Sequence, residues 1–351
     1  MNEYTEKSFI NLFEIVRNNY RFYYGTKYND DKSCSDFIAD FIERSGKRKI
    51  SLFDAIKYIE KKYAFRLNHI VNVFLLGIYL YYDCMIIRTS IDDELKHFNE
   101  QNKTERYEFD FIWFLICLFH DLGYKKEEDS KKMLAIYLNN EIVKLKQSNL
   151  GEITGVPTLY KDILNYLDYR KERFACIDHG IYAGRVLYNG LCDIRREHEN
   201  DDNHSNLSWS VDLENVYNYA AWIISAHNIF FAKSSFDKKL YKKYKLDKLI
   251  IEPDEYPISL NAYPMFYLFC LVDSLEPIKV FRDKELLRSL FLTISDKELK
   301  IRSEIRCGCH SSYFDKVKSL NDWLTPVKLD DRTRTLHIQF NFSLFGCRDV
   351  F

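Results

Sequence analysis

Apolar side chains recur every three or four residues from the start of the chain to about residue 280, which is the spacing of amphipathic and buried helices. The most apolar stretch, Phe109–Phe119, predicts a helix that is surrounded by protein on all sides. Asp178 stands where it can cap the start of a helix, and Pro277 stands where a helix must already have ended. Helices are predicted over residues 51–63, 69–80, 109–119, 179–191, 211–229 and 262–275.

The apolar period changes to two after about residue 284, which is the spacing of strands. Residues 290–294 and 299–305 alternate in this way and predict a hairpin. A helix over 313–324 and a strand over 336–340 are predicted to follow. The predicted fold class is mainly α, a helical bundle with a small C-terminal α+β unit. The predicted organisation is an N-terminal helical extension (1–60), a helical domain (61–285) and the C-terminal α+β unit (286–351).

The charge balance is nearly neutral, with 51 Lys and Arg residues against 52 Asp and Glu residues and a net charge of −1. This balance excludes the chain-wide basic character of many nucleic-acid-binding proteins, although a local basic surface is compatible with it. The longest apolar runs, Val73–Tyr82 and Phe111–Phe119, are about ten residues long and fall short of the ~18 residues that a membrane span needs. The nine Cys residues are scattered through mostly apolar segments, and the first residues show no signal-peptide pattern. We therefore expect a folded, cytoplasmic protein without a membrane partner.

Four of the nine histidines lie at the start, in the middle or at the end of a predicted apolar helix, and two aspartates are embedded in apolar sequence. An unpaired carboxylate in apolar surroundings is very unfavourable, and the apolar neighbours of these aspartates offer no partner. One interpretation is four separate structural histidines, each hydrogen-bonded in the core. The other is that imidazoles and carboxylates converge on a divalent metal ion, whose charge compensates the burial of both aspartates. The six residues are His69, His120, Asp121, His179, His227 and Asp273.

Four local sequences carry a resemblance to a known family. They are Arg66-Leu-Asn-His69-Ile-Val-Asn-Val73, Leu118-Phe-His-Asp-Leu-Gly123, Ala226-His227-Asn228 and Leu271-Val-Asp273-Ser274. In this order, with His179 between the second and the third, the chain resembles the HD superfamily of metal-dependent phosphohydrolases over most of residues 60–285. The resemblance implies an HD-type helical bundle for the metal-binding domain, residues 61–285.

The resemblance also implies a metal site and a reaction. It implies two divalent ions, Mn²⁺, Fe²⁺, Co²⁺ or Mg²⁺, and hydrolysis of a phosphate ester of a nucleotide by a metal-activated water. One ion would be held by His69, His120, Asp121 and Asp273, and the second by His179 and His227, with Asp121 bridging the two.

Basic residues near these sequences are candidates for binding the substrate phosphate. Lys125 and Lys126 follow the His-Asp turn, and Arg66 lies one helical turn before the first candidate histidine; with Asp121 they are the candidate catalytic residues. The alternative for each basic residue is a solvated or structural charge. Family members often carry Lys at the position of Tyr124, and the chain lacks the Gly-Tyr-Pro signature of the cyclic-dinucleotide branch, which disfavours a cyclic dinucleotide as substrate.

A second basic feature is the stretch 231–250, which holds seven Lys and two Asp residues and so has a local charge of +5. Such a run usually marks a solvated helix face, but it is compatible with a lid that attracts phosphate or with a path for a polynucleotide, Tyr241 and Tyr244 stacking on bases. The expected partner is a phosphorylated small molecule, a nucleotide, with nucleic acid as the alternative. Two other functions stay open: an HD-type di-iron oxygenase, and a non-catalytic module that binds a nucleotide or a partner.

Overall fold

The computed structural model describes residues 6–19, 64–103, 107–147, 150, 160–198, 211–232, 235–252, 254–281, 284–305 and 308–342. The helix predicted over residues 51–63 lies outside this set. The described residues form two compact units. The first unit contains the described residues of Met1–Ser45, Ile56–Glu94 and Pro253–Cys347, and the second contains those of Leu95–Glu252. The three-part organisation divided at residues 60 and 285 stays a prediction.

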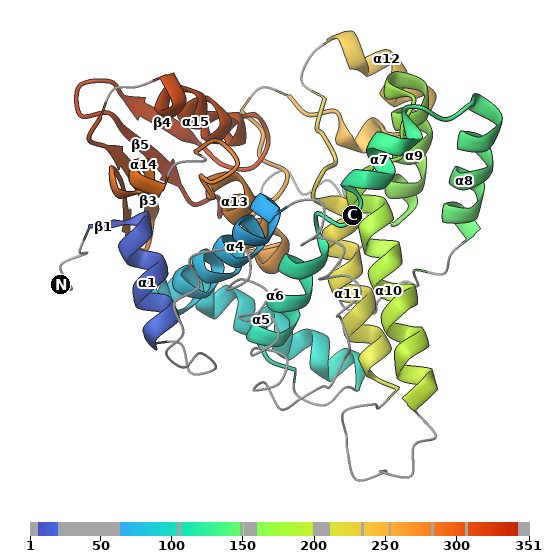
Figure 1. The fold of residues 1–351 in the computed structure, drawn as a ribbon, viewed down its shortest axis with the longest axis horizontal. Helices are drawn as coiled ribbons and strands as arrows, with labels where there is room; N and C mark the ends of the chain where they lie inside the picture. Colours follow the sequence, from blue (N-terminus) through green and yellow to red (C-terminus); the bar gives the residue numbers. More distant parts are fainter. Residues whose placement is uncertain are drawn as a thin grey trace. The chain divides into compact units, whose positions relative to one another are not determined.

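The first unit combines helices with a small sheet (Figure 1). Within it, α4 packs against α1 and α13. No single helix in the described part of the chain is long and apolar enough to span a membrane, although the bent pair Leu67–Asp83 and Met85–Asn102, which turns by 99°, passes the same test together. The helices are α1 (Phe9–Asn19), α4 (Ala64–Asp83), α5 (Met85–Asn102, which begins in this unit), α13 (Pro264–Leu275), α14 (Lys284–Arg288), α15 (Gly308–Lys318) and the 3₁₀ turn η3 (Ser319–Asp322).

The sheet of the first unit has its strands in the order β1-β2-β3-β5-β4, all neighbours antiparallel. The predicted hairpin of β2 and β3 is confirmed, with Leu292 opposite Ile301, and alternate residues of both strands are buried. The predicted strand over 336–340 corresponds to β5, and the predicted helix over 313–324 begins earlier, as α15. The sequence pattern missed β1 and β4, because they are two and four residues long and too short to show a period. The strands are β1 (Lys7–Ser8), β2 (Leu290–Ile294), β3 (Glu298–Ser303), β4 (Val327–Asp330) and β5 (Thr335–Gln339).

The second unit is built from helices. α10 and α11 lie side by side, and α11 also packs against α6 (Figure 1). Every residue of α6 is buried, as its composition predicts. α11 is shorter than the predicted helix over 211–229: it begins at Leu213 and ends at Ala226, with His227 as its C-cap. The helices are α6 (Phe109–Phe119), α7 (Tyr124–Ser130), α8 (Ala135–Gln147), α9 (Tyr160–Phe174), α10 (His179–His198), α11 (Leu213–Ala226), α12 (Ser235–Lys243) and the 3₁₀ turn η2 (Asp247–Leu249).

Helix ends agree with two signals in the sequence. Oδ1 of Asp178 accepts hydrogen bonds from the backbone N–H groups of Gly180, at 3.0 Å, and Ile181, at 3.1 Å, and so caps α10. α13 ends at Leu275, two residues before Pro277, as predicted. The chain is therefore mainly helical with a small C-terminal antiparallel sheet, which confirms the predicted fold class.

Candidate metal-binding site

In the first unit, the imidazole of His69 lies between two carboxylates. His69 is a fully buried residue of α4, and its Nε2 lies 3.0 Å from Oδ1 of Asp273 in the last turn of α13. Its Nδ1 lies 2.7 Å from Oε2 of Glu276, the C-cap residue of the same helix. One helix end therefore supplies an oxygen to each nitrogen of the ring.

Glu276 is fully buried, with hydrogen-bond donors on both oxygens. Its Oε1 accepts bonds from Nδ2 of Asn72 and from the backbone N–H of Ile278, each at 3.0 Å. Because the carboxylate acts as an acceptor throughout, Nδ1 of His69 is the donor to Oε2. In a neutral His69 with its proton on Nδ1, the lone pair of Nε2 faces Oδ1 of Asp273, which is an arrangement that a cation shared by the two atoms would stabilise.

Asp273 is more exposed than its apolar sequence context suggests. Its side chain is 21% exposed, and Nζ of Lys279 lies 2.9 Å from Oδ1, the oxygen that also faces His69. The expectation that Asp273 is buried is therefore wrong. The chain turns at Pro277, whose carbonyl accepts the backbone N–H of Phe281, and this turn brings Lys279 to the end of α13.

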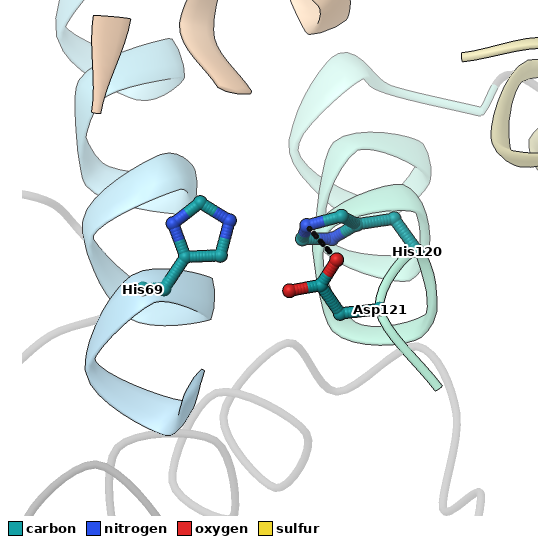
Figure 2. Close-up of side chains that lie close together, drawn as sticks. All are labelled: His69, His120 and Asp121. Carbon is teal, nitrogen blue, oxygen red and sulfur yellow. Dashed lines mark ion pairs between the residues drawn. The ribbon is translucent and has the colours of Figure 1, made fainter. Parts of the chain in front are cut away.

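In the second unit, His120 and Asp121 directly follow α6 and are both buried (Figure 2). His120 is the C-cap residue, and its Nδ1 donates a 2.7 Å hydrogen bond to the carbonyl of Cys117, one turn earlier. Its Nε2 lies 3.3 Å from Oδ1 of Asp121, and a dashed line marks this contact in Figure 2. The third side chain drawn there is His69 of α4. The end of α6 therefore presents an imidazole nitrogen and a carboxylate oxygen as adjacent ligand atoms.

Two more histidines belong to this region of the second unit, His227 beside His120 and His179 beside His227. His179 begins α10, and its Nδ1 lies 2.8 Å from Oε2 of Glu127 in α7. His227 follows α11, and its Nδ1 donates a 2.6 Å hydrogen bond to the carbonyl of Ile224. The ring centroids of His120 and His227 are 5.8 Å apart, and those of His179 and His227 are 5.2 Å apart. These three rings form one cluster.

Two glycines permit the close packing around this cluster. A Cβ on Gly123, in the turn after α6, would lie 1.9 Å from the carbonyl oxygen of His179. A Cβ on Gly180 would lie 2.9 Å from the ring of His227. Tyr124, next to Gly123, stacks on the ring of His179 with 3.8 Å between centroids. The glycine of the His-Asp turn is therefore needed for packing, since a larger side chain would force the backbone of α10 away.

Glu127 belongs to a buried group of charged residues beside His179. Its Oε1 accepts a 3.0 Å hydrogen bond from Nη2 of Arg170, whose Nε lies 3.4 Å from Oδ2 of Asp178. Burial raises the pKa of Glu127, but the hydrogen bond and charge of His179, together with the charge of Arg170, outweigh burial and lower the pKa to about 2. Glu127 is therefore ionised and accepts the hydrogen bond from Nδ1 of His179.

All four candidate histidines share one feature, which is that Nδ1 is hydrogen-bonded to an oxygen. This arrangement is usual for metal-binding histidines, because it leaves Nε2 as the ligand atom and fixes the ring. Two ligand atoms that bind one ion at right angles, each about 2.1 Å from it, are about 3.0 Å apart. The Nε2–Oδ1 distances of 3.0 Å (His69–Asp273) and 3.3 Å (His120–Asp121) fit this value. Two buried groups could hold metal ions: one contains His120 and Asp121, and the other consists of Glu127, Asp178 and His179.

The sequence did not single out Glu276 and Glu127. Glu276 lies three residues after Asp273, and this one-turn spacing at a helix end is a signal that could have indicated it. Glu127 lies on the exposed-looking sequence Lys-Lys-Glu-Glu-Asp, where nothing distinguishes the buried Glu127 from the exposed Glu128 next to it.

The candidate phosphate-binding lysines have partners within the second unit. Nζ of Lys126 lies 2.5 Å from Oε2 of Glu141, and Nζ of Lys125 lies 3.7 Å from Oδ2 of Asp129. The side chain of Arg66 lies outside the described part of the chain. A role for these three residues in binding phosphate stays a prediction.

The lysine-rich stretch forms α12 and η2 and packs on α9 of the second unit. Tyr241 is 1% exposed, and its hydroxyl donates a 2.5 Å hydrogen bond to the carbonyl of Phe230. The prediction that Tyr241 stacks on bases is therefore wrong, because the amphipathic pattern of α12 turns this ring into the core. Lys243 and Tyr244 both contact Glu172 of α9. Most of the described lysines of the stretch are exposed, which favours a solvated face.

The structure arranges the predicted ligands in two sets, one within each unit. Comparisons with protein-family models, with curated proteins and with solved structures find no match to this chain. The resemblance to the HD superfamily and the convergence of both sets on one centre therefore stay predictions. The set of the first unit is His69 and Asp273, and that of the second is His120, Asp121, His179 and His227.

Proposed function

We propose that this protein is a metal-dependent phosphohydrolase that cleaves the phosphate ester of a nucleotide. The observation that carries the proposal is that two buried histidines, His69 and His120, have Nδ1 bonded to one oxygen and Nε2 close to the carboxylate of an aspartate. An oxygen at Nδ1 does not by itself distinguish these residues, because His310 and His337 have one too. A carboxylate oxygen close to Nε2, as at His69 and His120, is the additional feature that a shared metal ion would explain. The type of reaction is taken from the resemblance to the HD superfamily.

The donor set suits divalent transition metals. Imidazole nitrogens with carboxylate oxygens bind Mn²⁺, Fe²⁺ and Co²⁺ well, and Mg²⁺, which prefers oxygen, less well. When bound, a pair of such ions supplies a Lewis acid to a phosphate oxygen and a nucleophile from water near neutral pH. In the proposal, one ion is held by His69, His120, Asp121 and Asp273, and the second by His179 and His227, with Asp121 shared.

Basic side chains would hold the remaining phosphate oxygens. Lys279 places an ammonium group 2.9 Å from Oδ1 of Asp273, where a phosphate beside this carboxylate would meet a charged donor. Lys125 and Lys126 are paired with acidic residues of their own unit. Such partly exposed pairs contribute only about 0–1 kcal/mol, so either lysine can exchange its partner for a phosphate oxygen.

Metal analysis and a substrate panel test the proposal together. The purified protein is expected to hold about two divalent ions per chain and to release phosphate or nucleoside from at least one nucleotide with Mn²⁺, Fe²⁺, Co²⁺ or Mg²⁺. His120→Ala should lose both metal and activity while the protein stays folded. His97→Ala is the matched control, because His97 contacts Gln101 on the exposed face of α5 and the variant should retain both properties.

Two results would contradict the proposal. One is a folded protein that binds none of these metals. The other is a metal-loaded protein that hydrolyses no nucleotide of the panel. Iron retained through aerobic purification, together with substrate-dependent O₂ consumption, would instead indicate a di-iron oxygenase.

A further inference from the structure

The four histidines obtain the oxygen at Nδ1 in two different ways, and their positions in helices explain the difference. His120 and His227 are C-cap residues, and the last carbonyls of a helix have no partner within it, so a carbonyl three residues earlier is available to Nδ1. His69 lies inside α4, where carbonyls already accept bonds from the helix, and His179 begins α10, where the backbone offers N–H groups instead. These two histidines need an oxygen from another element.

We propose that Glu276 and Glu127 are positioning residues of the metal centre, which hold His69 and His179 in the tautomer that presents Nε2 to a metal ion. This inference rests on the proposed function and deepens it. Neither carboxylate is a ligand in this assignment. Each acts through the histidine that it orients, and each belongs to the same unit as its histidine.

The surroundings of Glu276 fit this role. The side chain is fully buried, and the donors on Oε1, from Asn72 and Ile278, leave Oε2 to one partner, His69. A carboxylate oxygen at Nδ1 also increases the basicity of Nε2, which strengthens a bond from Nε2 to a metal. Asn72 lies on α4, one turn after His69, so the histidine and the residue that orients its carboxylate move together.

The surroundings of Glu127 are built on the same plan in the second unit. Oε2 of Glu127 accepts two hydrogen bonds from His179, one from Nδ1 at 2.8 Å and one from the backbone N–H at 3.2 Å. Oε1 accepts Arg170, which also lies beside Asp178. Arg170, together with Lys131, whose Nζ lies 3.3 Å from Oε1 of Glu127, supplies the positive charge that two buried carboxylates require, so this group can orient His179 without an ion of its own.

Substitution to Gln tests the two carboxylates with little change of shape. Every donor around Glu276 and Glu127 points at a carboxylate oxygen, so either orientation of a Gln amide places its NH₂ group against a donor. Glu276→Gln and Glu127→Gln should therefore release the histidine tautomers. The matched control is Glu298→Gln, since Oε2 of Glu298 lies 3.3 Å from Nδ1 of His337 on the sheet, in a pair that plays no part in the proposal.

Two measurements separate this inference from the proposed function. Long-range ¹H–¹⁵N NMR of metal-free, histidine-labelled protein reports tautomers directly; His69 and His179, assigned by their Ala variants, should be protonated at Nδ1 in the parent protein and lose this preference in the Gln variants. Titration with Mn²⁺ should show affinity about 10–100-fold weaker in both Gln variants and unchanged in the control.

The outcomes are distinct. Unchanged tautomers and unchanged Mn²⁺ affinity in folded Gln variants would overturn the inference while leaving the proposed function standing. Absence of Mn²⁺ binding in the parent protein would overturn the proposed function, and the positioning role with it, even if the tautomers change as expected. Circular dichroism identifies a variant that fails to fold; Asn72→Asp then replaces it as the test for Glu276, because a second carboxylate at Oε1 should disturb the same tautomer.

Discussion

The histidines at helix C-termini and the histidines held by carboxylates depend on different parts of the molecule. His120 and His227 bond to carbonyls of their own helices, so forming the helix is sufficient to hold Nδ1. His69 and His179 depend on side chains from other elements, and one of these, Glu276, lies 207 residues away in the sequence. A backbone carbonyl cannot be removed by substitution, whereas a carboxylate can. The first pair should therefore tolerate changes in their surroundings that the second pair does not.

The largest effect on activity is expected at Asp121, which lies beside His120, one of the two histidines held by a carbonyl of their own helix. Asp121→Asn removes the charge of the proposed shared ligand, and under the proposed function it should lower the rate of nucleotide hydrolysis by about 10³-fold or more. The fold should remain, because the carbonyl of Cys117 still holds His120. Steady-state kinetics with Mn²⁺ measure the effect, and His337→Ala on β5 is the control. A rate within a few-fold of the parent protein would contradict the assignment.

The next largest effect, on stability, is expected at Gly123, which lies in the turn after α6 and packs against the backbone of His179. Gly123→Ala places a Cβ 1.9 Å from the carbonyl oxygen of His179 and should lower the free energy of unfolding by about 3 kcal/mol. Urea denaturation measures the change. Gly190→Ala in α10 is the matched control, since nothing lies within 4 Å of its Cβ, and it should raise stability by about 0.5–1 kcal/mol. Equal behaviour of the two variants would show that the turn adapts freely.

Metal removal should have a smaller effect on stability. At a free Mn²⁺ concentration of about 100 times Kd, binding adds about 2.7 kcal/mol to the free energy of unfolding, and EDTA should remove this contribution. Thermal unfolding with and without Mn²⁺ measures the difference. In His69→Ala and in His227→Ala the stabilisation by Mn²⁺ should be smaller, which tests one histidine of each kind. Full stabilisation in either variant would remove that histidine from the ligand set.

The smallest effect is expected at Cys117, and it tests directly whether a backbone carbonyl alone holds His120. Cys117→Ala removes a buried thiol but keeps the carbonyl that accepts Nδ1 of His120, so Mn²⁺ affinity should stay as in the parent protein. The free energy of unfolding should fall by about 1 kcal/mol, because a small buried side chain is lost. Titration with Mn²⁺ and urea denaturation measure the two quantities. A loss of affinity comparable to that of Glu276→Gln would mean that the helix-end histidines are not held by the backbone alone.

Local patterns were sufficient for much of the fold. α6 and the hairpin of β2 and β3 lie where the apolar periods place them, and Asp178 caps α10 as its position predicts. The patterns failed where an element is very short, as β1 is, or where a boundary depends on packing. The end of α11 is such a boundary: the helix ends at Ala226, and the ring of the following His227 lies next to those of His120 and His179.

The sequence by itself determined the candidate ligands, because an imidazole or a carboxylate within apolar sequence is conspicuous wherever it occurs. Only the tertiary structure decided their partners: Glu276 and Lys279 beside the pair of the first unit, and Glu127 with Arg170 beside His179. The physical reason is the range of the interactions. A helix makes its hydrogen bonds between residues four apart, so a short stretch of sequence is enough to predict it. A side chain that orients a histidine can come from any segment that folding brings to the ring. The spacing of apolar residues along the chain therefore does not predict which residue it will be.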